Sequence, residues 1–196
     1  GILFPFISDR QERDVMMNTV AAVWDGNETW MVLGGAGLFA AFPLVYSTVL
    51  SALYMPIILM VIALIFRGVA FEFRFKANKT KHLWDQAFIW GSILSSFLQG
   101  VILGAYIQGI ETTNGIYTGG GLDWLTPFSL FTGISVVVLY ATLGCGWLIF
   151  KTEKMLQNRM FELMPKLLIS LLMIFACVSI YTPLAHPQIA ERWFSQ

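Results

Sequence analysis

Two carboxylates lie three residues apart near the start of the chain, at the mouth of an apolar segment. Asp25 and Glu28 belong to the sequence Trp-Asp-Gly-Asn-Glu-Thr-Trp of residues 24–30, and an uncharged, glycine-rich run follows as far as Pro43. A carboxylate that enters lipid is costly, so a chain that keeps two of them there usually uses them. The chemistry open to such a pair is proton transfer or the binding of an ion.

Helical spacing places these polar residues together. Asp25, Glu28 and Thr29 share one face, and Asn18 lies seven residues earlier, so the four residues form one predicted polar stripe. Two adjacent carboxylates at low dielectric should not both ionise at neutral pH, and a carboxyl that titrates near neutrality can pass protons. A proton relay or ion site is one interpretation. The other is a pair that caps a helix start or bonds to a neighbouring helix, and the residues alone leave both open.

A third acidic residue, Glu72, lies between Arg67 and Arg74, close to the predicted inner end of a helix. It is interpreted either as a snorkelling, ion-paired carboxylate or as a residue that takes up protons. The two histidines, His82 and His186, fall at opposite ends of the predicted helices, so they cannot ligate one haem together. The sequence indicates no ligand set for a metal or a haem and no catalytic residue in this chain.

The elements that must position these residues are membrane helices. Of the 196 residues, 57% are hydrophobic and only 12% are charged, with a mean hydropathy of +0.69, whereas a soluble domain carries about 25% charged residues. The net charge is zero and no basic face is evident, so nucleic acid is not expected as a partner. Membrane lipid is the expected surrounding.

Apolar run lengths and helix breakers predict five spanning helices. The fold class is therefore all-α, a polytopic transmembrane helix bundle that forms a single domain over residues 1–196. Pro43 ends the first helix, Pro56 is expected to kink the second, and Thr126 is a plausible N-cap for the fourth. The predicted helices cover about 15–42, 44–73, 84–110, 127–150 and 163–181.

The positive charges orient this bundle. Five antiparallel helices place eleven of the twelve Lys and Arg residues at one end, and only Arg192 lies at the other. By the positive-inside rule, the end that carries these charges is cytoplasmic. The apolar start of the chain, residues 1–7, is expected to be the tail of a further helix that arrives at this same end, so the chain is expected to be a fragment.

Three blocks of sequence resemble subunit II of the cytochrome bd-type quinol oxidases, with most similarity to the branch called cyanide-insensitive. These blocks are residues 24–30, residues 34–46 (Gly-Gly-Ala-Gly-Leu-Phe-Ala-Ala-Phe-Pro-Leu-Val-Tyr) and residues 66–74 (Phe-Arg-Gly-Val-Ala-Phe-Glu-Phe-Arg). The resemblance is dense over about residues 1–90 and looser afterwards. It implies an eight-helix subunit, of which five helices are present here.

The resemblance also implies a function and partners. The family enzyme oxidises quinol and reduces dioxygen to water in the bacterial inner membrane. Haem b and haem d (or a further haem b) belong to subunit I, the expected partner in a heterodimer, through which quinol is used as substrate. This chain is then expected to bind no haem itself, and the resemblance leaves room for a bound quinone.

Residue by residue, the resemblance separates the three carboxylates. Asp25 matches the family's intramembrane aspartate, which is implicated in a proton path, and Glu72 matches a position where the family has an acidic residue. Glu28 departs from relatives that carry Gln, which leaves its role in proton transfer less secure. Two alternatives stand beside the oxidase subunit: a fragment of a cation-coupled secondary transporter, and a purely structural membrane subunit.

Overall fold

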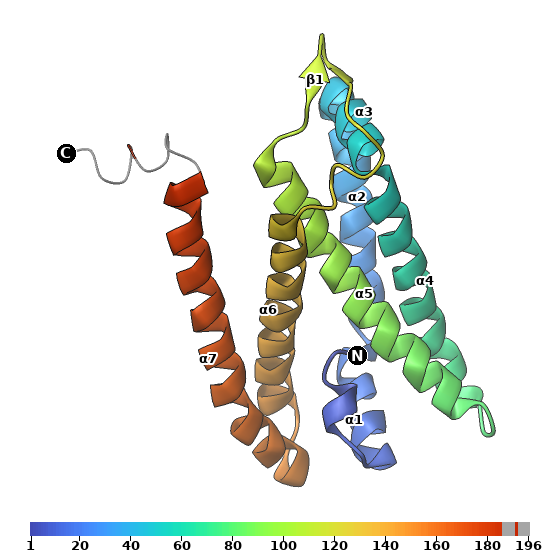
Figure 1. Ribbon diagram of the computed structural model, residues 1–196. Helices are drawn as coiled ribbons and strands as arrows, with labels where there is room; N and C mark the ends of the chain where they lie inside the picture. The colour runs from blue at the N-terminus through green and yellow to red at the C-terminus, as the bar shows by residue number, and fades with distance from the viewer. Residues whose placement is uncertain (186–190, 192–196) are drawn as a thin grey trace.

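The computed structural model describes residues 1–185 and residue 191, and nearly all of this chain is helical (Figure 1). A 3₁₀ turn, η1 (Phe4–Phe6), precedes the first helix, and a hairpin of β1 (Thr112–Thr113) and β2 (Ile116–Tyr117) interrupts the helices near the middle of the chain. The helices are α1 (Arg10–Ala21), α2 (Trp24–Ala41), α3 (Pro43–Ala52), α4 (Tyr54–Lys76), α5 (Lys81–Gln108), α6 (Pro127–Lys151) and α7 (Lys154–Ala185).

Four helices in the described part of the chain, α4, α5, α6 and α7, are long and apolar enough to cross a membrane. This confirms the all-α, polytopic class. The predicted number of five spanning helices differs from the four observed, and the first predicted span is the one that does not qualify. Polar residues occupy the first two turns of α2, which lowers the hydropathy of this 18-residue helix.

The helix predicted over 15–42 is two helices. Asp9 starts α1 earlier than predicted, because its side chain accepts a hydrogen bond of 2.8 Å from the backbone N–H of Gln11. The chain then breaks at Ala22 and Val23 before α2 begins. Asn18 lies on α1 and Asp25 on α2, so the predicted four-residue polar stripe does not run along one continuous helix.

The helix predicted over 44–73 also divides, into α3 and α4, at Leu53. Proline has no N–H and cannot close the hydrogen bond to the carbonyl four residues earlier. For Pro56 that carbonyl belongs to Ala52, where α3 ends. The predicted disturbance at Pro56 is confirmed, and it is a break rather than a kink within one helix.

The remaining boundaries follow the prediction with one exception. Helix α5 covers Lys81–Gln108 instead of 84–110, and α6 begins as predicted with Thr126 as its N-cap. Helix α7 starts at Lys154, nine residues before the predicted 163, because Leu156 and Met160 are buried against the other helices and extend the helix beyond its apolar run. Helix α7 continues through Pro183 to Ala185, beyond the predicted end at 181, and Arg192 lies outside the described residues.

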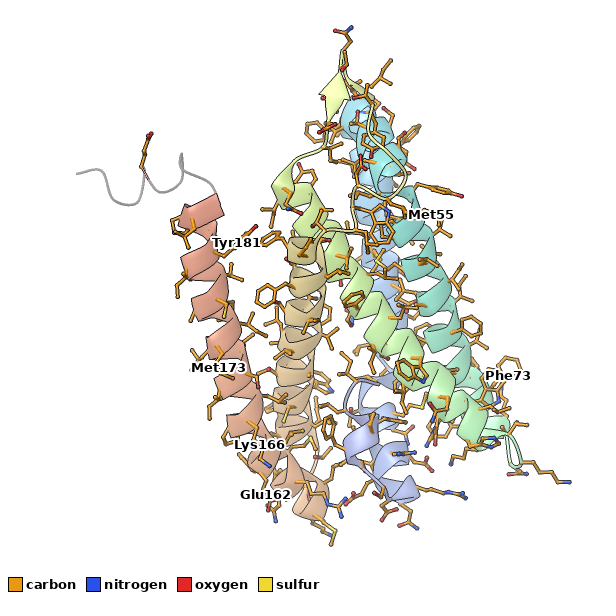
Figure 2. All side chains as sticks on the ribbon, viewed as in Figure 1. Met55, Phe73, Glu162, Lys166, Met173 and Tyr181 are labelled. Carbon is orange, nitrogen blue, oxygen red and sulfur yellow. The ribbon has the colours of Figure 1, made fainter. Side chains whose placement is uncertain are left out.

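Neighbouring helices in sequence pack side by side, α4 on α5, α5 on α6 and α6 on α7 (Figure 1). Glycines allow α5 and α6 to approach each other closely. A Cβ atom on Gly100 would lie 2.6 Å from the carbonyl oxygen of Thr132, and one on Gly133 would lie 2.7 Å from the ring of Phe97. Figure 2 shows Tyr181 on α7 directed toward α6, where its ring stacks on Phe128 with centroids 5.1 Å apart.

The main buried core lies at one end of the bundle, where η1 and α1 pack among the ends of the longer helices. Its members come from every element there, and they include Phe4, Met17, Phe71, Phe88 and Met160. The links α4–α5 and α6–α7 lie at this same end, while α3 and the hairpin lie at the opposite end (Figure 1). Trp24, the first residue of α2, packs against this core, directly before Asp25.

Candidate functional site

Asp25 occupies the first turn of α2 and is exposed. Its carboxylate makes no hydrogen bond or ion pair with the residues that the structure describes. Its backbone carbonyl accepts a bond of 3.0 Å from the Thr29 hydroxyl, which anchors that side chain to the helix. The acidic position near a helix N-terminus is electrostatically favourable, and it leaves the carboxyl group accessible to a proton donor or acceptor.

Glu28, one turn further along α2, is engaged by an arginine. Nη2 of Arg67 donates a hydrogen bond of 2.7 Å to Oε1 of Glu28, and each side chain is 26% exposed. Within the described residues, no hydrogen bond joins Glu28 to Asp25. The two carboxylates therefore do not share a proton as an adjacent pair, and the structure brings in Arg67 instead.

One face of α4 holds the start of α2. Arg67 pairs with Glu28, and Phe71, one turn later, stacks on Trp24 with centroids 5.0 Å apart and planes 8° apart. Gly68 lies beneath the same indole, and a Cβ there would be 3.3 Å from the ring. Ion pairing and aromatic stacking thus fix the first two turns of α2 against α4.

Glu72 lies on a different side of α4 from this contact. Its carboxylate is exposed and is 3.4 Å from Nζ of Lys76, one helical turn away. No hydrogen bond links Glu72 to Asp25 or Glu28 in the described chain. The structure agrees with an ion-paired surface carboxylate and does not bring the three predicted residues into one cluster.

Sequence reasoning missed a group of charges that the structure assembles at the end of the bundle where α1 lies. Arg74 is fully buried and pairs with Asp14 of α1, where Nη1 and Oδ1 are 2.5 Å apart, and with Asp85 of α5. Asp14 also accepts a bond of 3.0 Å from Lys81, and Arg13 is 3.2 Å from Asp85. We call Arg13, Asp14, Arg74, Lys81 and Asp85 the α1 ion-pair cluster.

The electrostatics of the α1 ion-pair cluster are visible at Asp14, which lies outside the four spanning helices. Burial raises the pKa of the Asp14 carboxyl, but the hydrogen bonds and positive charges of Arg74 and Lys81 outweigh burial and bring this pKa below its ordinary value. Asp14 is thus held as a carboxylate. The alternating charges of the cluster are visible in the sequence. From the sequence alone, however, Arg74 and Lys81 indicate only the orientation of the helices and not their ion pairs.

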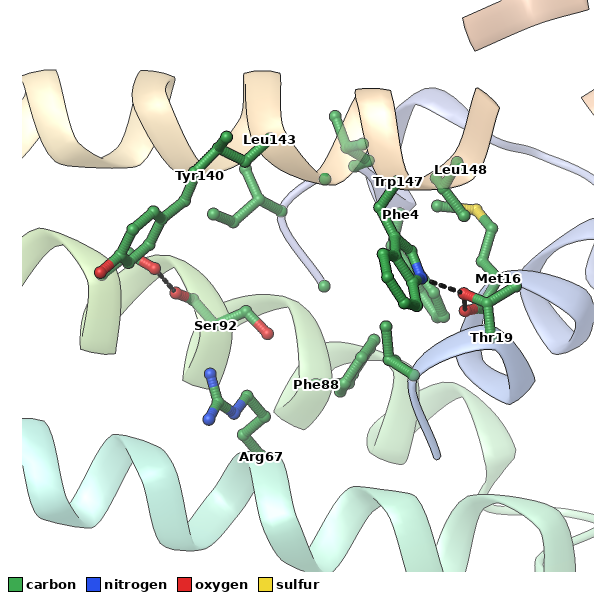
Figure 3. A pocket seen from close by; sticks show the side chains of 16 residues that line it. Phe4, Met16, Thr19, Arg67, Phe88, Ser92, Tyr140, Leu143, Trp147 and Leu148 are labelled. Atoms are coloured by element: carbon green, nitrogen blue, oxygen red, sulfur yellow. Dashed lines mark hydrogen bonds between the residues drawn. The ribbon is translucent and has the colours of Figure 1, made fainter. Parts of the chain in front are cut away.

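A cavity of about 400 Å³ lies beside Arg67, between α1, α5 and α6. Figure 3 shows Arg67 reaching from α4 toward Ser92 on α5, and the indole of Trp147 donating to the Thr19 hydroxyl at 3.3 Å. Nε of Arg67 is buried and has no hydrogen-bond partner in the described chain. The polar members of the lining are Thr19, Arg67, Ser92, Ser96, Tyr140 and Trp147. The rest of the lining is apolar, so these polar side chains form part of a mainly apolar wall.

The described residues contain no group of three or more His, Cys, Asp and Glu side chains that could hold a metal ion. Of the two histidines, His82 is the second residue of α5, and His186 lies outside the described residues. Proton exchange is chemistry open to the exposed carboxyl group of Asp25.

Comparison with known proteins identifies a family for this chain. The family model described as "Cytochrome bd terminal oxidase subunit II" matches residues 1–194. The chain is 34% identical over 167 residues to the "Probable cytochrome oxidase subunit 2" of Haemophilus influenzae, covering 80% of this chain and 44% of that protein. The "Cytochrome bd ubiquinol oxidase subunit 2" of Bacillus subtilis is 34% identical over 161 residues, covering 80% and 47%.

The "Cytochrome bd-I ubiquinol oxidase subunit 2" of Escherichia coli is 32% identical to the chain over 171 residues, covering 81% of this chain and 44% of that protein. The chain thus spans less than half the length of the curated relatives that it matches. The resemblance seen in the motifs is confirmed, while the assignment to the cyanide-insensitive branch stays a prediction. The chain belongs to the cytochrome bd terminal oxidase subunit II family.

Proposed function

We propose that this chain is part of subunit II of a membrane-bound quinol oxidase that reduces dioxygen to water in the respiratory chain. The single observation that carries the proposal is the family match over residues 1–194. Two of the relatives are named ubiquinol oxidase subunit 2, which supports quinol as the reductant and a second subunit as the partner. A fragment of a cation-coupled secondary transporter is not favoured by these matches.

The proposed location is the bacterial inner membrane, with the charged end of the bundle in the cytoplasm. Helix α1, the α4–α5 link and the α6–α7 link lie together at that end (Figure 1), and together with the helix ends that adjoin these links they carry most of the Lys and Arg residues. The positive-inside rule then places this end in the cytoplasm. Asp25 would lie toward the side from which protons are taken up.

The proposed partner is the haem-bearing subunit I, with haem b and haem d (or a further haem b) held there. No residue of this chain is proposed as a haem ligand. Reduction of dioxygen consumes protons, so the contribution proposed for this chain is scaffolding and a proton path. A quinone bound by this subunit and contacts with membrane lipid remain part of the proposal.

Asp25 is the proposed proton carrier. Its carboxyl group is exposed at the foot of α2 and has no partner among the described residues, so it can change its protonation state without breaking an ion pair. Glu28 is held by Arg67 and is proposed to tune Asp25 by its charge. Glu72, exposed beside Lys76, is proposed to collect protons at the cytoplasmic surface.

The test is Asp25→Asn in the intact two-subunit complex, with quinol-driven oxygen uptake and the haem spectrum as readouts. Loss of oxygen uptake with a normal haem spectrum is expected, because Asn keeps the shape of Asp but cannot carry the proton. Glu111→Gln is the matched control, since Glu111 is an exposed carboxylate at the opposite end of the bundle. Unchanged oxygen uptake in Asp25→Asn would support the purely structural alternative.

A further inference from the structure

Helix α1 is tied to the rest of the bundle largely by charged side chains. It buries only Met16 and Met17. Ion pairs connect it to three other helices: Asp14 reaches α4 and α5, and Glu12 reaches Arg159 of α7 at 2.8 Å. The position of α1 thus depends on these pairs more than on apolar contact.

Arg74 is the one fully buried member of the α1 ion-pair cluster, with a side-chain exposure of 0%. From α4 it reaches Asp14 of α1 and Asp85 of α5, and its guanidinium carbon lies 5.5 Å from the centroid of the Phe4 ring. A guanidinium presents several donors in a fixed plane and can bridge two carboxylates, which an ammonium group does less well. Removing it would leave two carboxylates without their shared partner.

A very short link joins α1 to the start of α2, where Asp25 lies, so a shift of α1 also moves Asp25. Only Ala22 and Val23 separate α1 from α2. Directly after them, Trp24 stacks on Phe71, which lies three residues before Arg74 on α4. Asp14 in the second turn of α1 and Trp24 at the first residue of α2 therefore contact neighbouring turns of α4.

We propose that Arg74 is a positioning residue for Asp25: by fixing α1 against α4 and α5, it sets where α2 begins and how the Asp25 carboxyl group is presented. The Asp25 side chain forms no hydrogen bond or ion pair with the described residues, so its place depends on the backbone at the start of α2. This inference rests on the proposed function, in which Asp25 carries protons.

The first test is a double-mutant cycle in the intact oxidase complex with Arg74→Gln and Asp25→Asn. Arg74→Gln is expected to lower oxygen uptake roughly 10- to 100-fold, the range that a misplacement of about 1 Å can cause, with a normal haem spectrum and an altered pH profile. Arg74→Lys keeps the charge and should retain more activity. In the Asp25→Asn background, Arg74→Gln should have no further effect. A further loss there would overturn the proposal.

The matched control is Lys79→Gln, which removes an exposed cation five residues away that forms no ion pair with the described residues. It should keep oxygen uptake within about twofold, as surface substitutions usually do. If Arg74→Gln fails to assemble, Asp14→Asn decides the question, because it removes only the α1 partner and leaves Arg74 paired with Asp85. Full activity in Asp14→Asn with an unchanged pH profile would then overturn the proposal.

A second measurement separates this proposal from the proposed function. Spin labels at Ala22→Cys and Leu83→Cys, both exposed positions, report the distance between the end of α1 and α5 once Cys145 and Cys177 are replaced by Ala. Arg74→Gln should shift or broaden that distance, and Lys79→Gln should not. An unchanged distance overturns the positioning role, whereas normal uptake in Asp25→Asn with a shifted distance overturns only the proton role of Asp25.

Discussion

Arg67 donates a hydrogen bond of 2.7 Å to Glu28 and so joins the middle of α4 to the second turn of α2. Both side chains are about one quarter exposed, and one turn earlier Asp25 has no partner among the described residues. Of the two carboxylates that the sequence places together, one is committed to an ion pair and the other is available for proton exchange. This difference has a direct consequence for substitutions at the two positions.

Glu28→Gln should be tolerated. Gln keeps an oxygen that can accept the hydrogen bond from Arg67, and a partly exposed ion pair contributes less than about 1 kcal/mol to stability. Oxygen uptake by the complex should fall much less than in Asp25→Asn, because Glu28 is proposed to tune Asp25 by its charge and not to carry the proton itself. The measurement is oxygen uptake together with thermal unfolding of the purified complex. A loss as large as that of Asp25→Asn would show that Glu28 also carries protons.

Arg67→Gln should be more harmful than Glu28→Gln. It leaves the partly buried Glu28 carboxylate without a counter-charge, and such an orphaned charge costs more than the pair contributes. We expect a lower unfolding temperature than in Glu28→Gln, and the double variant Arg67→Gln, Glu28→Gln should recover part of the loss. No recovery in the double variant would mean that Arg67 acts mainly through another contact, such as the cavity beside it.

Local signals in the sequence were sufficient for some of the fold. Thr126 and Pro127 mark the start of α6 because capping and the fixed φ of proline act within one turn. The break between α1 and α2 could not be predicted in this way. It accompanies ion pairs such as Asp14–Arg74, between residues 60 positions apart, and an apolar run length carries no information about them.

The candidate site, like the fold, could be predicted from the sequence only in part. Asp25 and Glu28 stand out in the sequence because carboxylates are rare beside an apolar helix. The partner of Glu28 could not be identified, since the choice among several basic residues depends on which face of α4 meets α2. Arg67 and Phe71 share that face, whereas Glu72 is turned away from it. The sequence thus shows which carboxylates are unusual, but only the packing of the helices shows which basic residue each of them pairs with.

Gly100→Ala should destabilise the bundle. The added Cβ would lie 2.6 Å from the carbonyl oxygen of Thr132, which forces α5 and α6 apart, and overpacking of this kind costs about 1–3 kcal/mol. Gly34→Ala is the comparison, because nothing in the described chain lies within 4 Å of its added Cβ and alanine favours a helix by about 1 kcal/mol. The unfolding temperature measured in detergent should be lower in Gly100→Ala than in the unsubstituted protein, and it should not be lower in Gly34→Ala. Equal stability of both variants would contradict the observed crossing of α5 and α6.

The α1 ion-pair cluster predicts an acid sensitivity. The pKa of Asp14 is lower in the folded chain than when unfolded, so its contribution to stability is complete above the unfolded value of about 3.9 and is lost as the pH falls through the folded value. The unfolding temperature should therefore fall below about pH 4 more steeply in the unsubstituted complex than in Asp14→Asn. Parallel pH curves for the two proteins would show that Asp14 does not titrate on unfolding.

Glu72→Gln tests whether a surface carboxylate collects protons for Asp25. Glu72 and Lys76 are both well exposed, so the substitution should change stability by less than about 0.5 kcal/mol. Oxygen uptake should fall less than in Asp25→Asn, because water can replace an exposed proton collector but not a carboxyl group fixed at the foot of α2. The deficit should grow as the pH rises and protons become scarce. Lys76→Gln, which leaves the carboxylate in place, should not reproduce that pH dependence, and identical pH profiles for Glu72→Gln and the unsubstituted complex would remove Glu72 from the proton path.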